Sequence, residues 1–334
     1  MVTVKIDDAV IGNGKTYFIA EAGLNHNGDI KIAKQLIDSA FDCGADAVKF
    51  QTFKTEEFLA KSSQYFDLFK NVELTYEEFG ELYDHAKSVG ITFFSAPFDI
   101  TSADALKELN VPCFKIASSD LTNIPLLDHI SKFNTPMIIS TGLANITEVE
   151  EAIRICQKNG NDKLIILHCV ANYPTQPEET NLNVMTTLRK EFSLPVGYSD
   201  NGDSALVDLV AVSLGASVIE KHFTLDRELS GPDHSFSIDP NRLKQLISQI
   251  RLIEKIKGTG IKSPQKSELE NISAIRKSIT TKSDFQQNHV LTLKDLSIKR
   301  PALGIEPKYL QQVIGKKINK SISKDTPLVW DDLI

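Results

Sequence analysis

The chain has 334 residues, of which 41% are hydrophobic and 24% charged, close to the average for a folded globular protein. The net charge of -7 argues against nucleic-acid binding as the main role, because a phosphate backbone is bound by an excess of lysine and arginine. We expect a cytoplasmic protein. We find no signal peptide and no segment apolar enough to span a membrane, and the four cysteines are scattered and form no CxxC pair.

Short apolar runs alternate along the chain with amphipathic segments. The apolar runs are Tyr17–Ala20, Ala47–Phe50, Thr92–Ser95, Cys113–Ala117, Met137–Ser140, Leu164–His168, Pro195–Tyr198 and Ser217–Lys221. Between them, residues 32–41 keep a helical spacing of apolar side chains, and residues 243–253 do so after the last run. This alternation predicts an α/β fold, a closed (β/α)8 barrel of parallel strands. The alternative is a doubly wound open sheet, but the first turn reads EAGLNHNGD rather than GxGxxG.

The alternating pattern ends near residue 257. Residues 258–268 are rich in Gly, Ser, Lys and Pro, which is typical of a linker. The last 58 or so residues contain short strand-like runs and turns, about the size of a small β-rich domain. We therefore predict a barrel over residues 1–257, a linker over 258–275 and a small β-rich domain over 276–334.

Polar residues end each of the eight apolar runs, and in a barrel of this kind the active site lies at the carboxyl ends of the strands. Two of these residues are Lys49 and Lys115, and a buried lysine is costly unless it meets an anion. With the hydroxyls of Ser118 and Ser140 they predict a phosphate or carboxylate site. The alternative is that both lysines pair with carboxylates such as Asp120 and Glu220.

Two histidines and one carboxylate allow further chemistry. His222 at the end of the last run, with His234 twelve residues later, could bind a divalent metal; the alternative is that each is a hydrogen-bonded structural histidine. Glu21 is a candidate acid or base, because a carboxylate at a barrel mouth can be tuned towards a neutral pKa. Its alternative is a salt bridge to one of the lysines.

An ordered set of motifs resembles one family of enzymes. The motifs are EAGLNHNGD, KFQT, FSAPFD, KIASSD, STG, NYPT, GYSD, EKHFTLDR and SGPDHSFS, followed by RPALGI, VIGKK and PLVWDDL in the tail. Over nearly the whole chain this order resembles the nonulosonate (sialic acid) synthases, which include N-acetylneuraminate, legionaminate and pseudaminate synthases and related spore-coat enzymes. The resemblance implies a barrel followed by an antifreeze-like (SAF) domain, in a domain-swapped homodimer.

The resemblance also implies roles for individual residues. Those that match phosphoenolpyruvate-binding positions are Lys49, Gln51, Lys115, Ser118, Ser140, Asn172 and Ser199. Glu21 and Asp233 match acidic groups near the amino sugar, and Tyr173 matches an aromatic wall position. Arg300 matches the arginine that the SAF domain extends into the partner's active site.

The metal site implied by the resemblance departs from the family pattern. His222 matches one of two histidine ligands, but the position of the second is Asn201. An amide oxygen is a weaker ligand than imidazole, although it suits Mg²⁺ or Mn²⁺ with waters, and His234 is an alternative ligand. A second departure is Asp120, which stands where many members carry glutamate and is included among the catalytic candidates.

The resemblance implies a condensation of phosphoenolpyruvate with an N-acyl amino-sugar aldehyde, such as N-acetylmannosamine or a diacetamido hexose, giving a nonulosonic acid and phosphate. One rival is a 3-deoxy-octulosonate or heptulosonate phosphate synthase, and those enzymes lack the antifreeze-like tail. A second rival, of another class, is a non-catalytic sugar-binding homologue.

Overall fold

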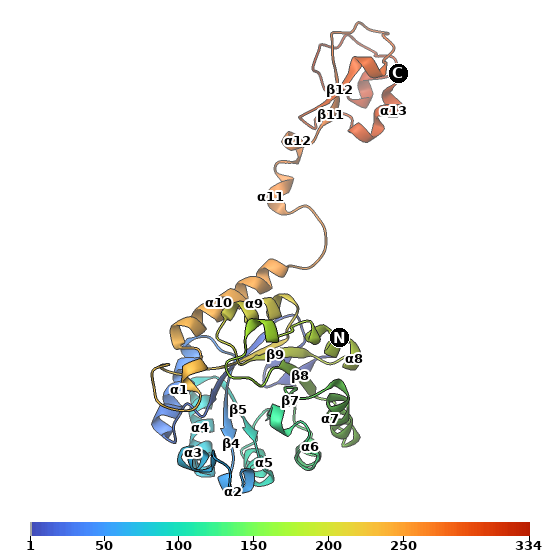
Figure 1. Cartoon of the computed structure of the whole chain (residues 1–334). Helices are drawn as coiled ribbons and strands as arrows, with labels where there is room; N and C mark the ends of the chain where they lie inside the picture. Colours follow the sequence, from blue (N-terminus) through green and yellow to red (C-terminus); the bar gives the residue numbers. More distant parts are fainter. Residues whose placement is uncertain (1) are drawn as a thin grey trace. The chain divides into compact units, whose positions relative to one another are not determined.

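The computed structural model describes residues 2–334 and divides the chain into two compact units, one ending at Gly258 and the other running from Thr259 to Ile334. Figure 1 shows both units, with labels on the helices and on some of the strands. Within residues 2–334, no helix combines the length and the apolar character that crossing a bilayer requires.

The first unit is a closed barrel of parallel strands surrounded by helices (Figure 1). The barrel strands are β3 (Tyr17–Gly23), β4 (Ala47–Thr52), β5 (Thr92–Pro97), β6 (Phe114–Ile116), β7 (Met137–Ser140), β8 (Leu164–Cys169), β9 (Val196–Asp200) and β10 (Val218–His222). They neighbour one another in chain order, and β10 pairs with β3 to close the ring. The predicted barrel is confirmed, and each predicted apolar run coincides with one strand.

The strands are apolar along most of their length because both faces are covered. One face fills the barrel interior and the other meets the helices, so β7 and β8 are buried at every residue. A short antiparallel hairpin, β1 (Val4–Ile6) and β2 (Ala9–Ile11), precedes the barrel and was not predicted. Its apolar side chains join the main core, and Asp7 in its turn accepts a hydrogen bond from the Thr92 hydroxyl at the start of β5 (2.9 Å).

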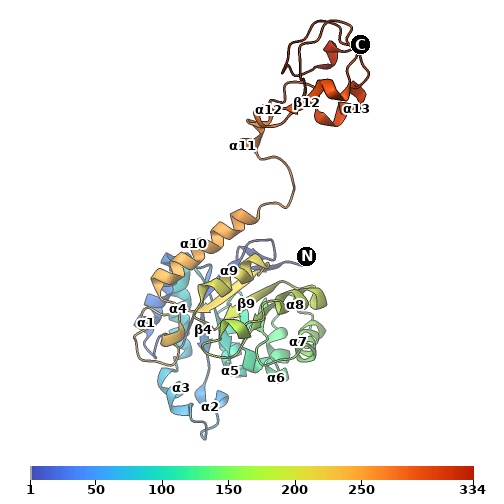
Figure 2. The ribbon, with the colours of Figure 1, turned by 45° about the horizontal axis from the view of Figure 1, so that its top comes forward.

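The helices of the first unit follow the strands, and several of them begin at a side-chain cap. They are α1 (Ile30–Asp42), α2 (Thr55–Phe58), α3 (Phe66–Val72), α4 (Tyr76–Val89), α5 (Ile100–Glu108), α6 (Ile124–Ser131), α7 (Ile146–Lys158), α8 (Val184–Phe192), α9 (Ala205–Ser213) and α10 (Pro240–Lys257). Asp29 caps α1, and Thr75 with Glu78 forms a capping box on α4. Figure 2 shows α10 beside α9, its packing neighbour.

The second unit has its own small apolar core, built around an antiparallel pair of strands. Its elements are α11 (Lys266–Leu269), α12 (Ile272–Ile275), β11 (Ser278–Thr281), β12 (Leu296–Lys299) and α13 (Leu310–Val313). Single 3-10 turns lie at Ser118–Asp120, Pro177–Glu179 and His234–Phe236 in the first unit and at Leu293–Asp295, Pro307–Tyr309 and Trp330–Asp332 in the second. The stretch expected to be a linker therefore includes two helices of one turn each, α11 and α12.

Candidate active site

A cavity of ≈ 950 Å³ opens at the carboxyl end of the barrel. Every barrel strand or the residue after it contributes to its lining: Glu21, Lys49, Gln51, Ala96, Lys115, Ala117, Ser140, Cys169, Ser199, Glu220 and His222. Parallel strands bring their carboxyl ends to one rim, so residues far apart in sequence meet there.

Two lysines and two glutamates form a buried, charge-balanced group on the floor of this cavity. The Lys49 ammonium lies 2.8 Å from a carboxylate oxygen of Glu21 and 3.7 Å from one of Glu220. Lys115 lies 3.6 Å from the other oxygen of Glu220. All four side chains are almost fully buried. The lysines therefore both line the cavity and pair with carboxylates, and Glu220 serves both of them while Asp120 does not.

Hydroxyl groups complete the floor. Lys115 donates a hydrogen bond to the Ser140 hydroxyl (2.7 Å), and the Ser199 hydroxyl donates to Glu220 (3.0 Å). Ser118 also lines the cavity and accepts a hydrogen bond from the Gly142 amide (3.0 Å). These groups would offer an anionic ligand both positive charge and directional donors.

Burial changes the pKa of these groups in opposite directions. Burial raises the pKa of Glu21, and Lys49 only partly offsets this. For Glu220 the two lysines outweigh burial and lower the pKa. Burial also lowers the pKa of the Lys115 ammonium. Two carboxylates with unequal proton affinity at one site are the usual arrangement for an acid and a fixed charge, with Glu21 as the group able to carry a proton.

His222 lies in an aromatic corner of the cavity. The Tyr173 ring meets it edge-on with centroids 5.8 Å apart, and the Phe236 ring does so at 5.1 Å. Its Nδ1 lies 3.7 Å from an Asp233 carboxylate oxygen and has no hydrogen-bond partner in the described part of the chain. Burial lowers the pKa of His222, so the ring is neutral and can act as a ligand, and burial raises the pKa of Asp233.

Asn201 also lines the cavity, with its amide orientation fixed by its neighbours. Its amide nitrogen donates a hydrogen bond to the Val170 carbonyl (2.8 Å). The amide oxygen is therefore the atom of Asn201 that could bind a metal ion. Among residues 2–334, no group of three or more His, Cys, Asp or Glu side chains could hold a metal ion. The donors that fit a cation are therefore one imidazole nitrogen and one amide oxygen, a set that Mg²⁺ or Mn²⁺ would complete with water or substrate.

Four of the predicted site residues do not line the cavity. Asp120 accepts hydrogen bonds from Ser119 on its own 3-10 turn and from Asn123, the N-cap of α6 (both 3.0 Å). Asn172 is exposed and donates to Glu179 (3.1 Å). His234 contacts the Thr224 hydroxyl through Nδ1 (2.6 Å) and the Asn27 amide through Nε2 (3.1 Å), so both ring nitrogens are engaged. Arg300 is exposed and follows β12 in the second unit.

Sequence reasoning missed an apolar wall of the cavity. Its members are Leu24, Tyr65, Phe69, Phe98 and Leu143. They lie on the connections between strands, and the sequence analysis considered only the residues that end the strands. The signal that could have revealed it is the density of phenylalanine at residues 53, 58, 66 and 69, in the connection after β4.

Comparisons with known proteins show the family and agree with the fold. Residues 36–262 match the NeuB family and residues 276–334 match the SAF domain. The chain is 47% identical to an uncharacterized protein of Methanocaldococcus jannaschii (100% of this chain, 99% of that one). It is 44% identical to N,N'-diacetyllegionaminic acid synthase of Campylobacter jejuni, over 93% of this chain and 98% of that one. A similar solved structure is that of N-acetylneuraminic acid synthetase from Leptospira borgpetersenii in complex with citrate. It superposes with a TM-score of 0.78 at 38% identity and covers 81% of this chain and 95% of that one.

The rival barrel enzymes are more distant. A truncated 3-deoxy-D-arabino-heptulosonate 7-phosphate synthase of Thermotoga maritima reaches a TM-score of 0.63 at 17% identity, covering 78% of this chain and 95% of that one, which shows a shared fold alone. The family match covers most of the barrel, and the relatives match across nearly the whole chain. The chain therefore belongs to the NeuB family, the family of the nonulosonic acid synthases, and carries a SAF domain at its C-terminal end.

Proposed function

We propose that this enzyme condenses phosphoenolpyruvate with the open-chain aldehyde of an N-acyl amino sugar, giving a nonulosonic acid and inorganic phosphate. The observation that carries the proposal is the buried floor of the cavity, where Lys49 and Lys115 lie beside Glu21 and Glu220. The 44% identical relative is named for the synthesis of N,N'-diacetyllegionaminic acid, which favours a diacetamido hexose over N-acetylmannosamine as the sugar.

The floor residues have separate tasks in this reaction. Lys49, Lys115 and the hydroxyls of Ser118, Ser140 and Ser199 would hold the phosphate and carboxylate of phosphoenolpyruvate. Gln51 donates a hydrogen bond to Glu21 (3.2 Å) and fixes the direction of that carboxyl group. Holding the reactants in one orientation and placing positive charge near the departing phosphate are the main sources of rate acceleration here.

The chemistry balances without a redox partner. The electrons of the C2=C3 double bond of phosphoenolpyruvate form a bond from C3 to the aldehyde carbon, and the aldehyde oxygen takes a proton. Water adds at C2 and loses a proton. The resulting tetrahedral carbon releases phosphate by breaking its C–O bond, and the C2 hydroxyl loses its proton to give the ketone. Glu21, whose pKa is raised by burial, is the group proposed to protonate the aldehyde oxygen or to deprotonate the water.

A divalent cation is an expected cofactor of this site. His222 and Asn201 would hold it, and when bound it would polarise the aldehyde oxygen as a Lewis acid. Tyr173 and Phe236 keep the His222 ring in place, and Asp233 lies beside its Nδ1. We expect EDTA to abolish activity and Mn²⁺ to restore it; full activity in metal-free enzyme would contradict the metal.

The working unit is proposed to be a homodimer in the cytoplasm, with Arg300 of each SAF domain completing the partner's site. Complementation tests this without truncating the chain. Arg300→Ala and Glu21→Gln enzymes should each be inactive. Mixing them in equal amounts under subunit exchange should restore about a quarter of the wild-type activity, because about half of the dimers become mixed and each mixed dimer has one intact site of two. No recovery in exchanged dimers would refute action in trans.

The defining experiment is a phosphate-release assay with phosphoenolpyruvate and a panel of amino sugars, with the product mass measured. The expected product mass is the sum of the sugar and pyruvate. Glu21→Gln should lower kcat by about 100-fold or more, and Glu56→Gln, at an exposed carboxylate on α2, serves as the matched control. Turnover only with a phosphorylated aldose would favour the heptulosonate-type rival, and sugar binding without turnover would favour a non-catalytic homologue.

A further inference from the structure

We propose that the connection between β4 and α4, residues 53–75, carries the surface that selects the sugar, and that Glu73 holds this connection in place. The inference rests on the proposed function and deepens it. Phe69 is assigned the contact with an apolar substituent of the sugar, a methyl group on either the acyl nitrogen or a deoxygenated carbon. Glu73 is a positioning residue that acts through Phe69.

The apolar wall and the hydroxyl groups of the cavity follow largely different strands. Leu24, Phe69 and Phe98 come after β3, β4 and β5, which are neighbours in the barrel. The Ser118 hydroxyl comes after β6, and those of Ser140 and Ser199 come from β7 and β9. The connections after β3, β4 and β5 therefore offer apolar contact, beside the charged floor that includes Lys49 of β4.

Phe69 is held from behind by other aromatic rings. Its ring meets Phe53 edge-on at 5.2 Å and Phe58 at 5.3 Å, and the Phe58 ring lies 4.7 Å from that of Phe98. Phe69 itself is half-buried and lines the cavity. Edge-on contacts of this kind fix the orientation of a ring, so Phe69 presents a rigid apolar surface to the cavity.

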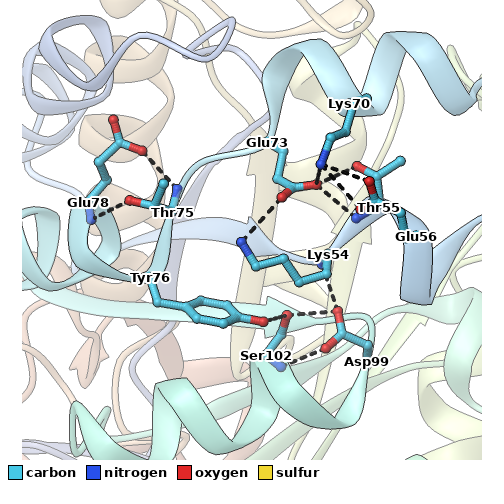
Figure 3. Close-up of polar contacts among 10 residues, drawn as sticks. All are labelled: Lys54, Thr55, Glu56, Lys70, Glu73, Thr75, Tyr76, Glu78, Asp99 and Ser102. Atoms are coloured by element: carbon cyan, nitrogen blue, oxygen red, sulfur yellow. Dashed lines mark hydrogen bonds and ion pairs between the residues drawn. The ribbon is translucent and has the colours of Figure 1, made fainter.

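Glu73 ties the two ends of this connection together, as Figure 3 shows. Its carboxylate accepts hydrogen bonds from the Thr55 amide (2.9 Å) and hydroxyl (2.8 Å) and from the ammonium groups of Lys54 (3.2 Å) and Lys70 (3.3 Å). Thr55 is fully buried at the start of α2, whereas Glu73 directly follows α3. The carboxylate thus closes the excursion that carries both Phe58 and Phe69.

The base of the connection is fixed to the next strand. The Lys54 amide donates to the Asp99 carboxylate (2.9 Å), which also accepts from the Ser102 amide (2.6 Å) and caps α5 (Figure 3). Glu73 engages Lys54 and Lys70, and neither lysine lines the cavity. Within residues 2–334, Lys49 and Lys115 are the only lysine or arginine side chains in the lining. The connection over residues 53–75 therefore supplies no cation for a sugar phosphate.

Two pairs of sugars test the inference. In the first pair, N-acetylmannosamine is compared with its 6-deoxy analogue, in which a methyl replaces the hydroxymethyl group at C6. In the second pair, N-acetylmannosamine is compared with N-formylmannosamine, which lacks the acyl methyl. We expect the methyl-bearing member of one pair to be favoured about 10- to 100-fold in kcat/KM. Phe69→Ala should bring this ratio close to 1, and Phe69→Leu should retain most of it. The pair that responds identifies the methyl; an equal loss for both members of both pairs overturns the proposal.

Glu73→Ala should reduce the same ratio while the KM for phosphoenolpyruvate changes less than twofold. Glu73→Gln keeps an acceptor oxygen for Thr55 and should give an intermediate ratio; it also serves if the alanine variant does not fold. Glu56→Ala is the matched control, because Glu56 binds Lys70 but not Thr55. A ratio unchanged in both Glu73 variants, or a KM for phosphoenolpyruvate raised by the same factor, refutes the positioning role.

Binding separates this inference from the proposed function. The affinity of wild-type enzyme for the same sugars is measured by calorimetry without phosphoenolpyruvate. If no sugar leads to phosphate release, the proposed function fails. If the enzyme still binds the methyl-bearing sugar more tightly and Phe69→Ala removes this preference, the contact between Phe69 and the methyl group is supported. Equal affinities within both pairs, or no binding, overturn it.

Discussion

Replacing Lys221 by methionine should destabilise the barrel by about 3–5 kcal/mol. Lys221 is 2% exposed, does not line the cavity and has a partner, Asp208, on α9. Its ammonium pairs with Asp200, lies 3.2 Å from an Asp208 carboxylate oxygen and donates to the Gly202 carbonyl (2.8 Å). Methionine is similar in volume to lysine, so the substitution leaves little cavity and mainly removes the charge that balances two buried carboxylates.

The effect is measured by urea unfolding at pH 7, followed by circular dichroism. Lys132→Met is the matched control, because Lys132 pairs with Asp128 while 59% exposed and should cost at most about 1 kcal/mol. Burial raises the pKa of Asp208, so this group takes up a proton readily as the pH is lowered, and the deficit of the Lys221 variant should then shrink. A deficit no larger than the control's, or one that grows as the pH is lowered, would refute the reasoning.

Three further predictions follow from the structure. Lys115→Met should raise the KM for phosphoenolpyruvate about 10- to 100-fold in steady-state assays, since it removes one charged donor; an unchanged KM would exclude contact with that substrate. Asn201→His should strengthen Mn²⁺ binding about 10-fold in calorimetry, because imidazole is the better ligand; weaker binding would contradict the assignment. Hydrogen bonds to Glu73 outweigh burial and lower its pKa from 4.5 to about 2, so its contribution, about 1–2 kcal/mol after solvent screening, should be complete above pH 4.5 and lost as the pH falls towards 2. Acid unfolding of Glu73→Gln beside wild type measures it, and a stability difference that stays constant down to pH 2 would disprove it.

The strands could be predicted because each is buried on both faces. A run such as Met137–Ser140 between two polar segments has few other structures available. The hairpin of β1 and β2 could not be predicted, because strands of three residues are too short to show the alternation of buried and exposed side chains. It is held by burial of Val4, Ile6 and Ile11 against the barrel, a contact between distant parts of the chain.

The floor of the cavity was predictable for the same reason as the strands. Once Lys49, Lys115 and Glu21 are placed at strand ends, barrel closure brings them together whatever the connections do. Residues on connections do not obey this rule. Tertiary contacts decide where they face, so His234 is turned towards Thr224 and Asn27 while Phe69 is turned into the cavity.

Two adjacent residues of opposite charge on β10, Glu220 and Lys221, also favour the correct register of this strand in the barrel. Glu220 faces the two cavity lysines, and Lys221 faces Asp200 and Asp208 on the other side of the same strand. A slip of one residue would exchange these faces. It would put a third ammonium group beside Lys49 and Lys115 and a third carboxylate beside the two aspartates. The wrong closure of the last strand against the first is therefore penalised by like-charge repulsion on both faces, so the charged residues of the cavity floor also help to select the register in which the ring closes.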